Sequence, residues 1–473
     1  METFNKITEK IDNIVWGIPL ILLILGCGIF LTIRVGGIQF RKLGLALKYM
    51  FKDEKDGSGE ISSFAALCTA LSATIGTGNI VGVATAIAAG GPGALFWMEI
   101  AALFGMATKY SEGLLAVKYR VKSADGKILG GPFYYIENGL GKKWKWLAAV
   151  FAAFGVVVGL LGIGTFAQVN SITSAANQFF DPKKAHTIEL FGTNYTYTQI
   201  ITGLIITILA GLIIIGGIKR IASVSEVVIP LMVVIYVSCC LIIIFTHITD
   251  VPAAFAEIFK SAFGLKAAAG GALGAIMVSM QKGIARGIFS NEAGLGSAPI
   301  AAAAAKTKEP VRQGLVTMTG TFIDTIIVCT MTGLTIVISG CIDSNPDLEG
   351  VEITDAAFRY GLPFPEKLSS FLLMTCLMFF AFTTILGWNY YSERCLSYLT
   401  NSSKKASAIF KWLYITAVFI GPYLAVSAVW NIADIFNGLM ALPNVIALLA
   451  LSGVISSETK KYCNKIKSKK GVN

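Results

Sequence analysis

The chain has 473 residues, of which 55% are hydrophobic and 14% are charged, and its formal net charge is +11. A soluble domain carries about a quarter charged residues, and a soluble chain of this length divides into domains joined by polar linkers. Apolar stretches recur here from residue 14 to residue 456 without a polar block of domain size, which excludes a soluble multidomain protein. We therefore interpret residues 1–473 as a single all-α, polytopic membrane domain.

The apolar runs predict about eleven membrane spans, since a helix needs about 20 apolar residues to cross a bilayer. The first run is too long for the core of a signal peptide and follows an acidic segment, so we expect it to be retained. The spans are expected at 14–33, 64–89, 93–117, 146–179, 197–217, 224–246, 270–304, 312–338, 368–398, 407–428 and 431–456. The fourth and seventh runs are long enough to tilt strongly or to break.

The basic residues indicate the orientation of these spans. If the N-terminus lies outside, most lysines and arginines fall on inner connections, including 34–55, 118–145 and 306–312, and on the basic tail 457–473. The positive-inside rule then predicts a multi-pass protein of the cell membrane with an outer N-terminus and a cytoplasmic C-terminus. Topology and contact with the anionic lipid bilayer explain the net charge, so no nucleic acid is expected as a partner.

The second span contains a cluster that is a poor helix interior. Gly76-Thr77-Gly78-Asn79 falls at mid-membrane, and glycine and asparagine both favour other backbone conformations. Non-helical backbone at this depth persists only where protein or a water-filled cavity satisfies it. The sequence therefore predicts a broken helix at Ile75–Asn79.

The seventh span again combines glycine with polar side chains. Lys282, Arg286 and Glu292 lie in this segment and are costly in hydrocarbon unless they are paired or solvated. We expect the second break at Met277–Gly287. We assign the three charges to a cytoplasmic gate, and proton coupling and structural pairing are the alternative roles. Asp324, in the eighth span, is expected to pair with one of them.

Two charges in the third span are three residues apart. Lys109 and Glu112 lie on one face of a helix near its cytoplasmic end. We expect them to form an interfacial ion pair.

The two breaks fall in the second and seventh spans. If 14–33 is a peripheral helix, ten spans remain in two halves, 64–246 and 270–456, and each half opens with its broken helix. This pattern is typical of an inverted-repeat secondary transporter. A break exposes a helix N-terminus that suits a carboxylate and carbonyl groups that suit a cation. Glycine alone more often permits close helix packing, but two such segments in matching positions favour breaks.

Three motifs make the chain resemble the alanine or glycine:cation symporter family, the sodium:alanine symporters. They are GGPGALFWM at 90–98, GGPFYYI at 130–136 and GIFSNEAGLGSAP at 287–299. Glu99 departs from the family pattern, which usually has tryptophan there. The resemblance covers nearly the whole chain. It implies Na⁺- or H⁺-coupled uptake of alanine or glycine through a leucine-transporter-type 5+5 inverted repeat, here preceded by one extra N-terminal helix.

The resemblance also implies site residues. Ile75–Asn79 is similar to the unwound stretch of the first core helix of that fold, so the N–H groups of Thr77 and Gly78 would hold the substrate carboxylate. A second Na⁺ site of the fold uses Asn79. The principal Na⁺ ligands would be the carbonyl groups of Ser72 and Ile75 and the hydroxyl groups of Thr383 and Thr384. Threonines in membrane helices also bond back to their own helix, which is the ordinary alternative for this pair.

Further substrate contacts are expected from the fourth and seventh spans. Gln168 and Asn170 are two residues apart and point in opposite directions, so one should face the substrate, and we favour Asn170. The seventh span is expected to contribute Met277, Ser279 and Gln281. The full predicted substrate set is Thr77, Gly78, Asn79, Gln168, Asn170, Met277, Ser279 and Gln281.

The expected function is secondary symport of alanine or glycine driven by Na⁺, with no enzymatic activity and no cofactor besides the coupling ion. Coupling to H⁺ is the alternative. A channel is less favoured, because a channel filter is built from repeated loops around a symmetry axis. A membrane enzyme would need paired catalytic carboxylates or a cluster of metal ligands in the sequence. The preference between alanine and glycine and the oligomeric state stay open.

Overall fold

The structure is a computed structural model that describes residues 2–52, 54, 57–123, 126–190, 193–265, 271–424 and 426–470. It is built almost entirely from helices. The first half of the chain contains α1 (Glu2–Val15), α2 (Ile18–Arg34), α3 (Ile38–Arg41), α4 (Leu43–Met50), α5 (Ser63–Thr74), η1 (Gly78–Gly82), α6 (Val83–Gly90), α7 (Gly93–Lys118), β1 (Val121–Lys122), β2 (Ile128–Leu129), α8 (Pro132–Leu140), η2 (Lys142–Trp144), α9 (Lys145–Leu161), α10 (Phe166–Phe180), β3 (Thr187–Leu190), β4 (Thr193–Thr196), α11 (Tyr197–Ile214) and α12 (Gly217–Thr246).

The second half is also helical. It contains α13 (Val251–Ala262), α14 (Ala272–Asn291), α15 (Ala298–Ala302), α16 (Pro310–Thr321), η3 (Phe322–Cys329), α17 (Thr330–Ser339), α18 (Cys341–Ser344), α19 (Val351–Gly361), α20 (Glu366–Leu399), α21 (Lys404–Ile420), η4 (Gly421–Tyr423), α22 (Val426–Ala450) and α23 (Ser452–Lys470). The strands form two short antiparallel hairpins, β1–β2 and β3–β4.

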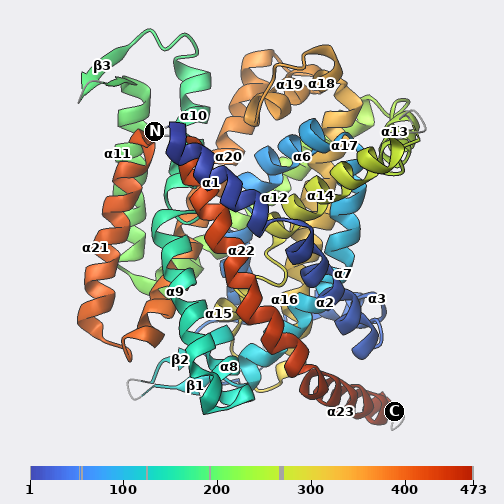
Figure 1. Ribbon diagram of the computed structural model, residues 1–473, viewed down its shortest axis with the longest axis vertical. Coiled ribbons are helices and arrows are strands. Elements are labelled where there is room, and N and C mark those ends of the chain that lie inside the picture. The colour runs from blue at the N-terminus through green and yellow to red at the C-terminus, as the bar shows by residue number, and fades with distance from the viewer. Residues whose placement is uncertain are drawn as a thin grey trace.

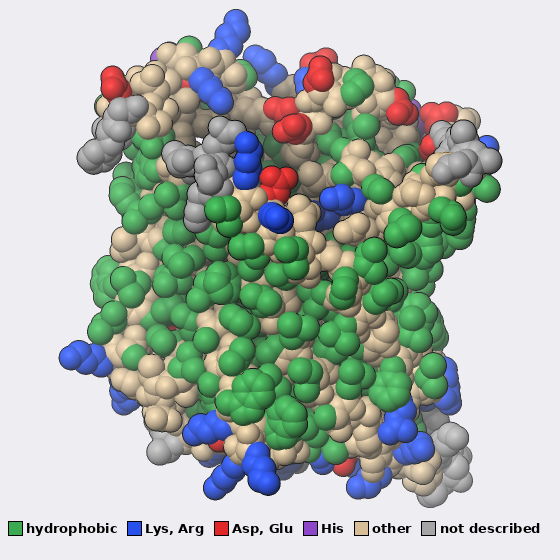
Figure 2. Space-filling view, viewed as in Figure 1, with side chains coloured by type: hydrophobic (Ala, Val, Ile, Leu, Met, Phe, Trp, Pro, Cys, Tyr) green, Lys and Arg blue, Asp and Glu red, His purple; other side chains and the backbone are tan. Residues whose placement is uncertain are grey.

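The two ends of the molecule differ in their elements. Figure 1 places β3, α13, α18 and α19 at what we call the upper end, and β1, β2, α3, α8 and α23 at the lower end. Figure 2 shows hydrophobic side chains over the middle of one face, lysine and arginine along its lower edge, and side chains of both charges at its upper edge. This banding is what a bilayer selects, because only the middle of the molecule contacts hydrocarbon.

Fewer than eleven of the described helices satisfy a test of length and apolar composition for a membrane span, so the predicted count is not confirmed. In the described part of the chain, eight helices are long and apolar enough to cross a membrane, or nine if the bent pair α5 and α6 counts as one span. The prediction also counted α7, which carries Glu99, Lys109 and Glu112, and α14, which carries Lys282 and Arg286. These charges lower the hydropathy of both helices.

The predicted break in the second span is confirmed. The segments Ser63–Thr74 and Gly78–Gly90 are bent by 54° relative to each other. Ile75 leaves the helix in an extended conformation, and the chain resumes as the π-helical turn η1. The N–H of Gly76 donates to Oδ1 of Asn79 at 2.9 Å, so a side chain replaces the helical acceptor.

The second break lies later than predicted. Helix α14 runs without interruption through Met277–Gly287 and ends at Asn291, and the next residue, Glu292, has a left-handed conformation with φ of 54°. The chain turns over residues 292–297 before α15 begins. Gly283 and Gly287 serve close packing instead, because a Cβ on Gly287 would lie 2.9 Å from Met98 of α7 and a Cβ on Gly283 would overlap the carbonyl of Ala94.

The long fourth span is also broken. Helices α9 and α10 are separated at residues 162–165. The hydroxyl of Tyr414 donates to the carbonyl of Gly164 at 2.6 Å and to that of Ile385 at 2.8 Å, so α21 braces this interruption against α20. The interruption sets where Gln168 and Asn170 of α10 project.

Candidate functional site

A cavity of about 840 Å³ extends from the connection between α18 and α19 to the break between α5 and η1. Glu349 and Gly350 line it near the upper end, and Thr77 and Gly78 line it at the break. Thr77 is 1% exposed, and its hydroxyl oxygen has no hydrogen-bond partner among the described residues. The cavity therefore connects the upper end with the unwound backbone that the sequence singled out.

The amides of α10 stand beside this break. Asn170 lines the cavity, and its Nδ2 lies 3.5 Å from the carbonyl oxygen of Leu424. Gln168 is 2% exposed, and its Oε1 has no hydrogen-bond partner in the described part of the chain. A Cβ placed on Gly76 would lie 3.5 Å from that oxygen. Gln168 thus presents an unused acceptor at the break, which suits an ammonium group.

The structure packs the end of α5, which carries Ser72 and Ile75, against the middle of α20, which carries Thr383 and Thr384. Oγ1 of Thr384 lies 3.5 Å from the carbonyl oxygen of Ile75, and a Cβ on Gly387 would lie 2.7 Å from Oγ of Ser72. Thr383, one residue before Thr384, is fully buried.

Both threonine hydroxyls also donate to the carbonyl of Phe380 on their own helix, at 2.9 Å for Thr383 and 3.0 Å for Thr384. The hydrogen bonds of both threonines to their own helix, which are the alternative to cation binding, are therefore present. The two interpretations are compatible, because a hydroxyl that donates its proton to a carbonyl keeps its lone pairs for a cation.

Asn79 braces the break instead of lining the cavity. Its Nδ2 donates to Oδ1 of Asp324 at 2.8 Å and to the Asp324 carbonyl at 3.0 Å. The second carboxylate oxygen of Asp324 accepts from Ser290 at 2.9 Å and from Thr325 at 2.8 Å. The expectation that Asp324 pairs with Lys282, Arg286 or Glu292 is therefore wrong, because neutral donors surround its carboxylate.

The three residues predicted from the seventh span lie elsewhere. Met277 is 49% exposed, Ser279 is buried against Gly90, and Gln281 lines a separate, smaller cavity. None of the three lines the 840 Å³ cavity. Helix α14 contributes Arg286 and Phe289 to that cavity instead, which the sequence pattern did not indicate because the helix continues past the expected break.

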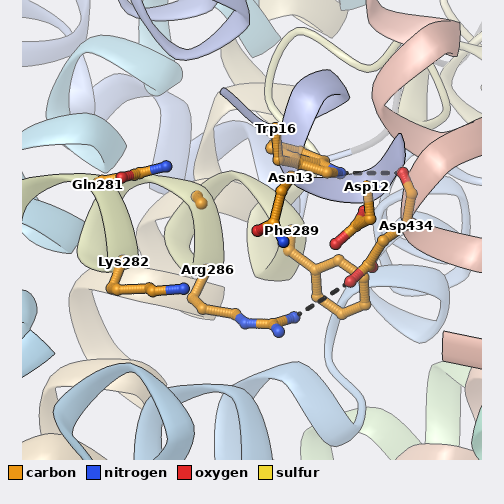
Figure 3. Close-up of a pocket in the computed structure, with 9 residues that line it drawn as sticks. Asp12, Asn13, Trp16, Gln281, Lys282, Arg286, Phe289 and Asp434 are labelled. Atoms are coloured by element: carbon orange, nitrogen blue, oxygen red, sulfur yellow. Dashed lines mark hydrogen bonds and ion pairs between the residues drawn. The ribbon is translucent and has the colours of Figure 1, made fainter. Parts of the chain in front are cut away.

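An ionic cluster borders the upper part of the cavity, and Figure 3 shows its side chains converging from three helices. Nη1 of Arg286 on α14 lies 3.6 Å from Oδ2 of Asp434 on α22. Trp16, which follows α1, donates from Nε1 to the carbonyl of Asp434 at 2.9 Å. Asp12 of α1 points into the same space, and the Arg286 guanidinium lies 5.6 Å from the ring centre of Phe289.

The predicted gate of Lys282, Arg286 and Glu292 is therefore divided between two places. Lys282 and Arg286 line the space beside α1, whereas Glu292 is buried just after the end of α14 and accepts from Nε1 of Trp388 at 3.1 Å and from the hydroxyl of Ser297. The helix continues between Arg286 and Glu292, so their side chains leave it on different faces.

The expected interfacial pair of Lys109 and Glu112 is also wrong. Lys109 is 2% and Glu112 is 0% exposed, and Nζ of Lys109 and Oε2 of Glu112 have no hydrogen-bond partner in the described structure. Oε1 of Glu112 accepts from the N–H of Gly294 at 3.2 Å and from Nδ2 of Asn444 at 2.7 Å. Both residues lie at the protein core, not at an interface.

Below the breaks, two chain segments close the lower end. The N–H of Glu60 donates to the carbonyl of Ala304 at 2.8 Å, and the N–H of Lys306 donates to that of Ile61 at 2.8 Å. Arg120, after α7, fastens this contact by donating to the carbonyls of Ser58 (2.6 Å), Ala303 (2.7 Å), Ala305 (2.9 Å) and Thr307 (2.5 Å). The cavity therefore extends toward the upper end, and the contact held by Arg120 closes the lower end.

Three comparisons place this geometry among known proteins. The family model described as the sodium:alanine symporter family matches residues 1–473. A transporter of Haemophilus influenzae is 53% identical over 466 residues, which are 98% of this chain and 97% of the relative. The sodium/alanine symporter AgcS of Methanococcus maripaludis is 44% identical over 476 residues, which are 99% of each chain.

The chain is also similar to the crystal structure of MhsT in complex with L-phenylalanine. The TM-score is 0.55 at 14% identity, and the match covers 85% of this chain and 98% of MhsT. This likeness shows a fold of the leucine-transporter type, as predicted. The count of eleven spans and the inverted repeat stay predictions.

Proposed function

The chain belongs to the sodium:alanine symporter family and is an amino-acid–cation symporter of a membrane; on that premise we propose that it takes up alanine or glycine together with Na⁺. It is a transporter and not an enzyme.

The choice of an α-amino acid as the substrate rests on one observation. The 840 Å³ cavity reaches the unwound backbone at Thr77 and Gly78, and Oε1 of Gln168, which has no hydrogen-bond partner among the described residues, lies beside the same break. Backbone N–H groups at a helix break suit a carboxylate. An amide oxygen without a partner suits an ammonium group. An α-amino acid carries both groups at the required short spacing.

The oxygen atoms near Ile75 support Na⁺ as the coupling ion. Carbonyl and hydroxyl oxygens from Ser72, Ile75, Thr383 and Thr384 are hard ligands of the kind that alkali cations take. Coupling follows from position, because Na⁺ at Ile75 would hold the end of α5 against α20 and fix the backbone that receives the substrate at Thr77. Each solute would then favour the conformation that binds the other.

Alternating access would need one closure at the lower end, beside Arg120, and another at the upper end, where the ionic cluster of Arg286 and Asp434 lies. We propose that the upper end faces the outside, because lysine and arginine gather at the lower edge and the positive-inside rule places them in the cytoplasm. The structure would then be open outward and sealed inward by Arg120. Rocking of one five-helix half, 64–246, against the other, 270–456, would open the lower end and let Arg286, Asp12 and Asp434 draw the upper end together.

Uptake by the purified full chain in liposomes tests the proposal. We expect alanine or glycine uptake that saturates and that requires an inward Na⁺ gradient. Uptake that is unchanged when choline replaces Na⁺ at fixed pH would contradict Na⁺ coupling, and an imposed pH gradient would then test H⁺. Uptake that does not saturate would contradict a carrier and favour a channel.

A further inference from the structure

Lys109, in α7, is a buried cation without a partner in the described part of the chain. Its side chain is 2% exposed, and its Nζ has neither a hydrogen bond nor an ion pair there. It is also the only lysine among the buried side chains that the structure describes. An isolated ammonium is costly to bury in a membrane protein, so such a residue requires a favourable electrostatic environment.

The ends of both broken helices supply that environment. Lys109 lines a cavity of about 10 Å³ together with Thr74 and Asn291. Thr74 is the last residue of α5, and Asn291 is the last residue of α14. The final carbonyl groups of a helix lack intrahelical partners and carry the negative end of its dipole. The volume of this cavity is close to the smallest that can hold one water molecule.

Buried acids add to the negative potential around Lys109. Glu112 lies three residues further along α7, and its Oε2 is buried with no partner in the described structure. Glu292 directly follows Asn291 and is 2% exposed. The hydrogen-bond donors to both carboxylates are neutral groups: Gly294, Asn444, Ser297 and Trp388. Lys109 is thus the cation that offsets the negative potential of these carboxylates.

We propose that Lys109 is a fixed cation that takes the place of one transported cation at the helix breaks, so that each amino acid moves with a single cation. This inference rests on the proposed symport function. Interrupted helices with unpaired carbonyl ends attract cations, and an ammonium held by a covalent side chain fills that role without crossing the membrane. The remaining cation position is the one beside Ile75 and Thr384, on the α20 side of α5.

The number of charges moved per alanine tests the inference in the unaltered protein. Proteoliposomes with fixed cation and alanine gradients are clamped at a series of membrane potentials, and the potential of zero net alanine flux gives the charge ratio. We expect one charge per alanine, and a ratio of two would overturn the inference. The ratio counts charge whichever cation carries it. Na⁺-independent uptake would therefore overturn the proposed Na⁺ coupling without obscuring this result.

Substitution of the lysine provides the second test. In Lys109→Met the vacated position must be filled from solution, so the Hill coefficient for the coupling cation should rise from about one to about two. The half-saturating concentration should increase about tenfold or more, and the charge ratio should rise to two. Lys109→Arg keeps the charge and should keep the wild-type ratio.

Lys118→Met is the matched control, because Lys118 ends the same helix and makes an exposed ion pair with Glu458. It should leave both the Hill coefficient and the charge ratio unchanged. A Lys109→Met protein that transports with the wild-type ratio and cation dependence would refute the inference. If Lys109→Met does not fold, the wild-type charge ratio decides.

Discussion

The hydroxyl oxygen of Thr384 lies 3.5 Å from the carbonyl oxygen of Ile75, so the middle of α20 meets α5 where that helix ends. The two residues are 309 positions apart in the chain. Their meeting joins an unwound backbone, whose carbonyl has lost its helical donor, to a pair of threonines on an unbroken helix. This is the contact through which cation binding and the conformation of the break can influence each other.

We expect Thr383→Ala combined with Thr384→Ala to raise the Na⁺ concentration for half-maximal uptake about tenfold, which corresponds to about 1.4 kcal/mol. Two of the four proposed oxygen ligands are lost, whereas the alanine contacts at Thr77 and Gln168 remain. Uptake should therefore recover at high Na⁺. Thr375→Ala is the control, since Thr375 lies on the same helix and its hydroxyl donates outside this site to Phe371 at 2.7 Å. An unaltered Na⁺ half-saturation in the double variant would remove both threonines from the site.

Arg120→Gln should weaken the closure of the lower end. The guanidinium donates to four carbonyl groups on two segments, and hydrogen bonds from charged groups contribute more than neutral ones. A loss of about 2 kcal/mol would increase the opening equilibrium roughly 30-fold. Hydrogen exchange of the amides at 58–61 and 304–306, measured by mass spectrometry, should accelerate accordingly.

Arg220→Gln is a suitable control for this measurement, because Arg220 donates to the carbonyl of Leu212 at a different part of the molecule. Unchanged protection of the amides at 58–61 and 304–306 in Arg120→Gln would show that the backbone pairing closes the lower end without the arginine.

The contacts of Glu54 with Thr307 and Lys308 predict that the stability of the lower end depends on pH. Partial burial raises the pKa of Glu54, but the hydrogen bonds from Thr307 (2.7 Å) and Lys308 (2.8 Å) and the charge of Arg312 outweigh it, so the pKa is lowered. A lowered pKa in the folded state means that the contact stabilises the fold above the unfolded pKa of about 4.3 and that this stability is lost as the pH falls through the folded value.

Glu54→Gln should therefore lower the Tm in detergent at pH 7, and the difference from wild type should shrink as the pH falls below about 4.3 and through the lower pKa that Glu54 has in the folded state. Below the folded-state pKa the wild-type carboxylate is itself protonated. A difference in Tm that persists unchanged at pH 3 would show that the effect comes from packing and not from the charge.

The first break could be predicted and the second could not, for a physical reason. Gly76, Thr77, Gly78 and Asn79 stand together, and no helix surface could use all four for packing. Gly283 and Gly287 are one helical turn apart. This spacing is typical of a packing face, but two glycines in one helix can also indicate that the helix is weak. Only the position of α7 shows that they face a neighbour.

Long-range partners account for the other differences. The sequence contains Arg286, Asp434 and Asp12, but their separations along the chain give no indication that α1, α14 and α22 meet (Figure 3). Lys109 and Glu112 have the spacing of an ion pair, yet the donors from Gly294 and Asn444 hold the carboxylate in another direction. Local spacing predicts which side chains share a face, whereas tertiary packing decides what that face meets.

Gln168 and Asn170 are two candidates for the same role in substrate binding, and binding measurements can decide between them. The sequence favours Asn170 for the substrate, but in the structure Oε1 of Gln168 is the buried acceptor without a described partner, while the Asn170 amide already lies near Leu424 and Ser174. If Gln168 receives the ammonium group, Gln168→Leu should remove a hydrogen bond to a charged group and cost about 2 kcal/mol, or roughly 30-fold in the Kd for alanine.

Asn170→Leu is the matched variant, with the same change of side chain two residues away on the same helix. Asn170 lines the 840 Å³ cavity, where water can replace its amide, so we expect its Kd for alanine to stay within about threefold of wild type. Equilibrium binding of radiolabelled alanine at saturating Na⁺ compares the two directly. A larger loss for Asn170→Leu than for Gln168→Leu would reverse the assignment and place the ammonium group on the opposite side of α10.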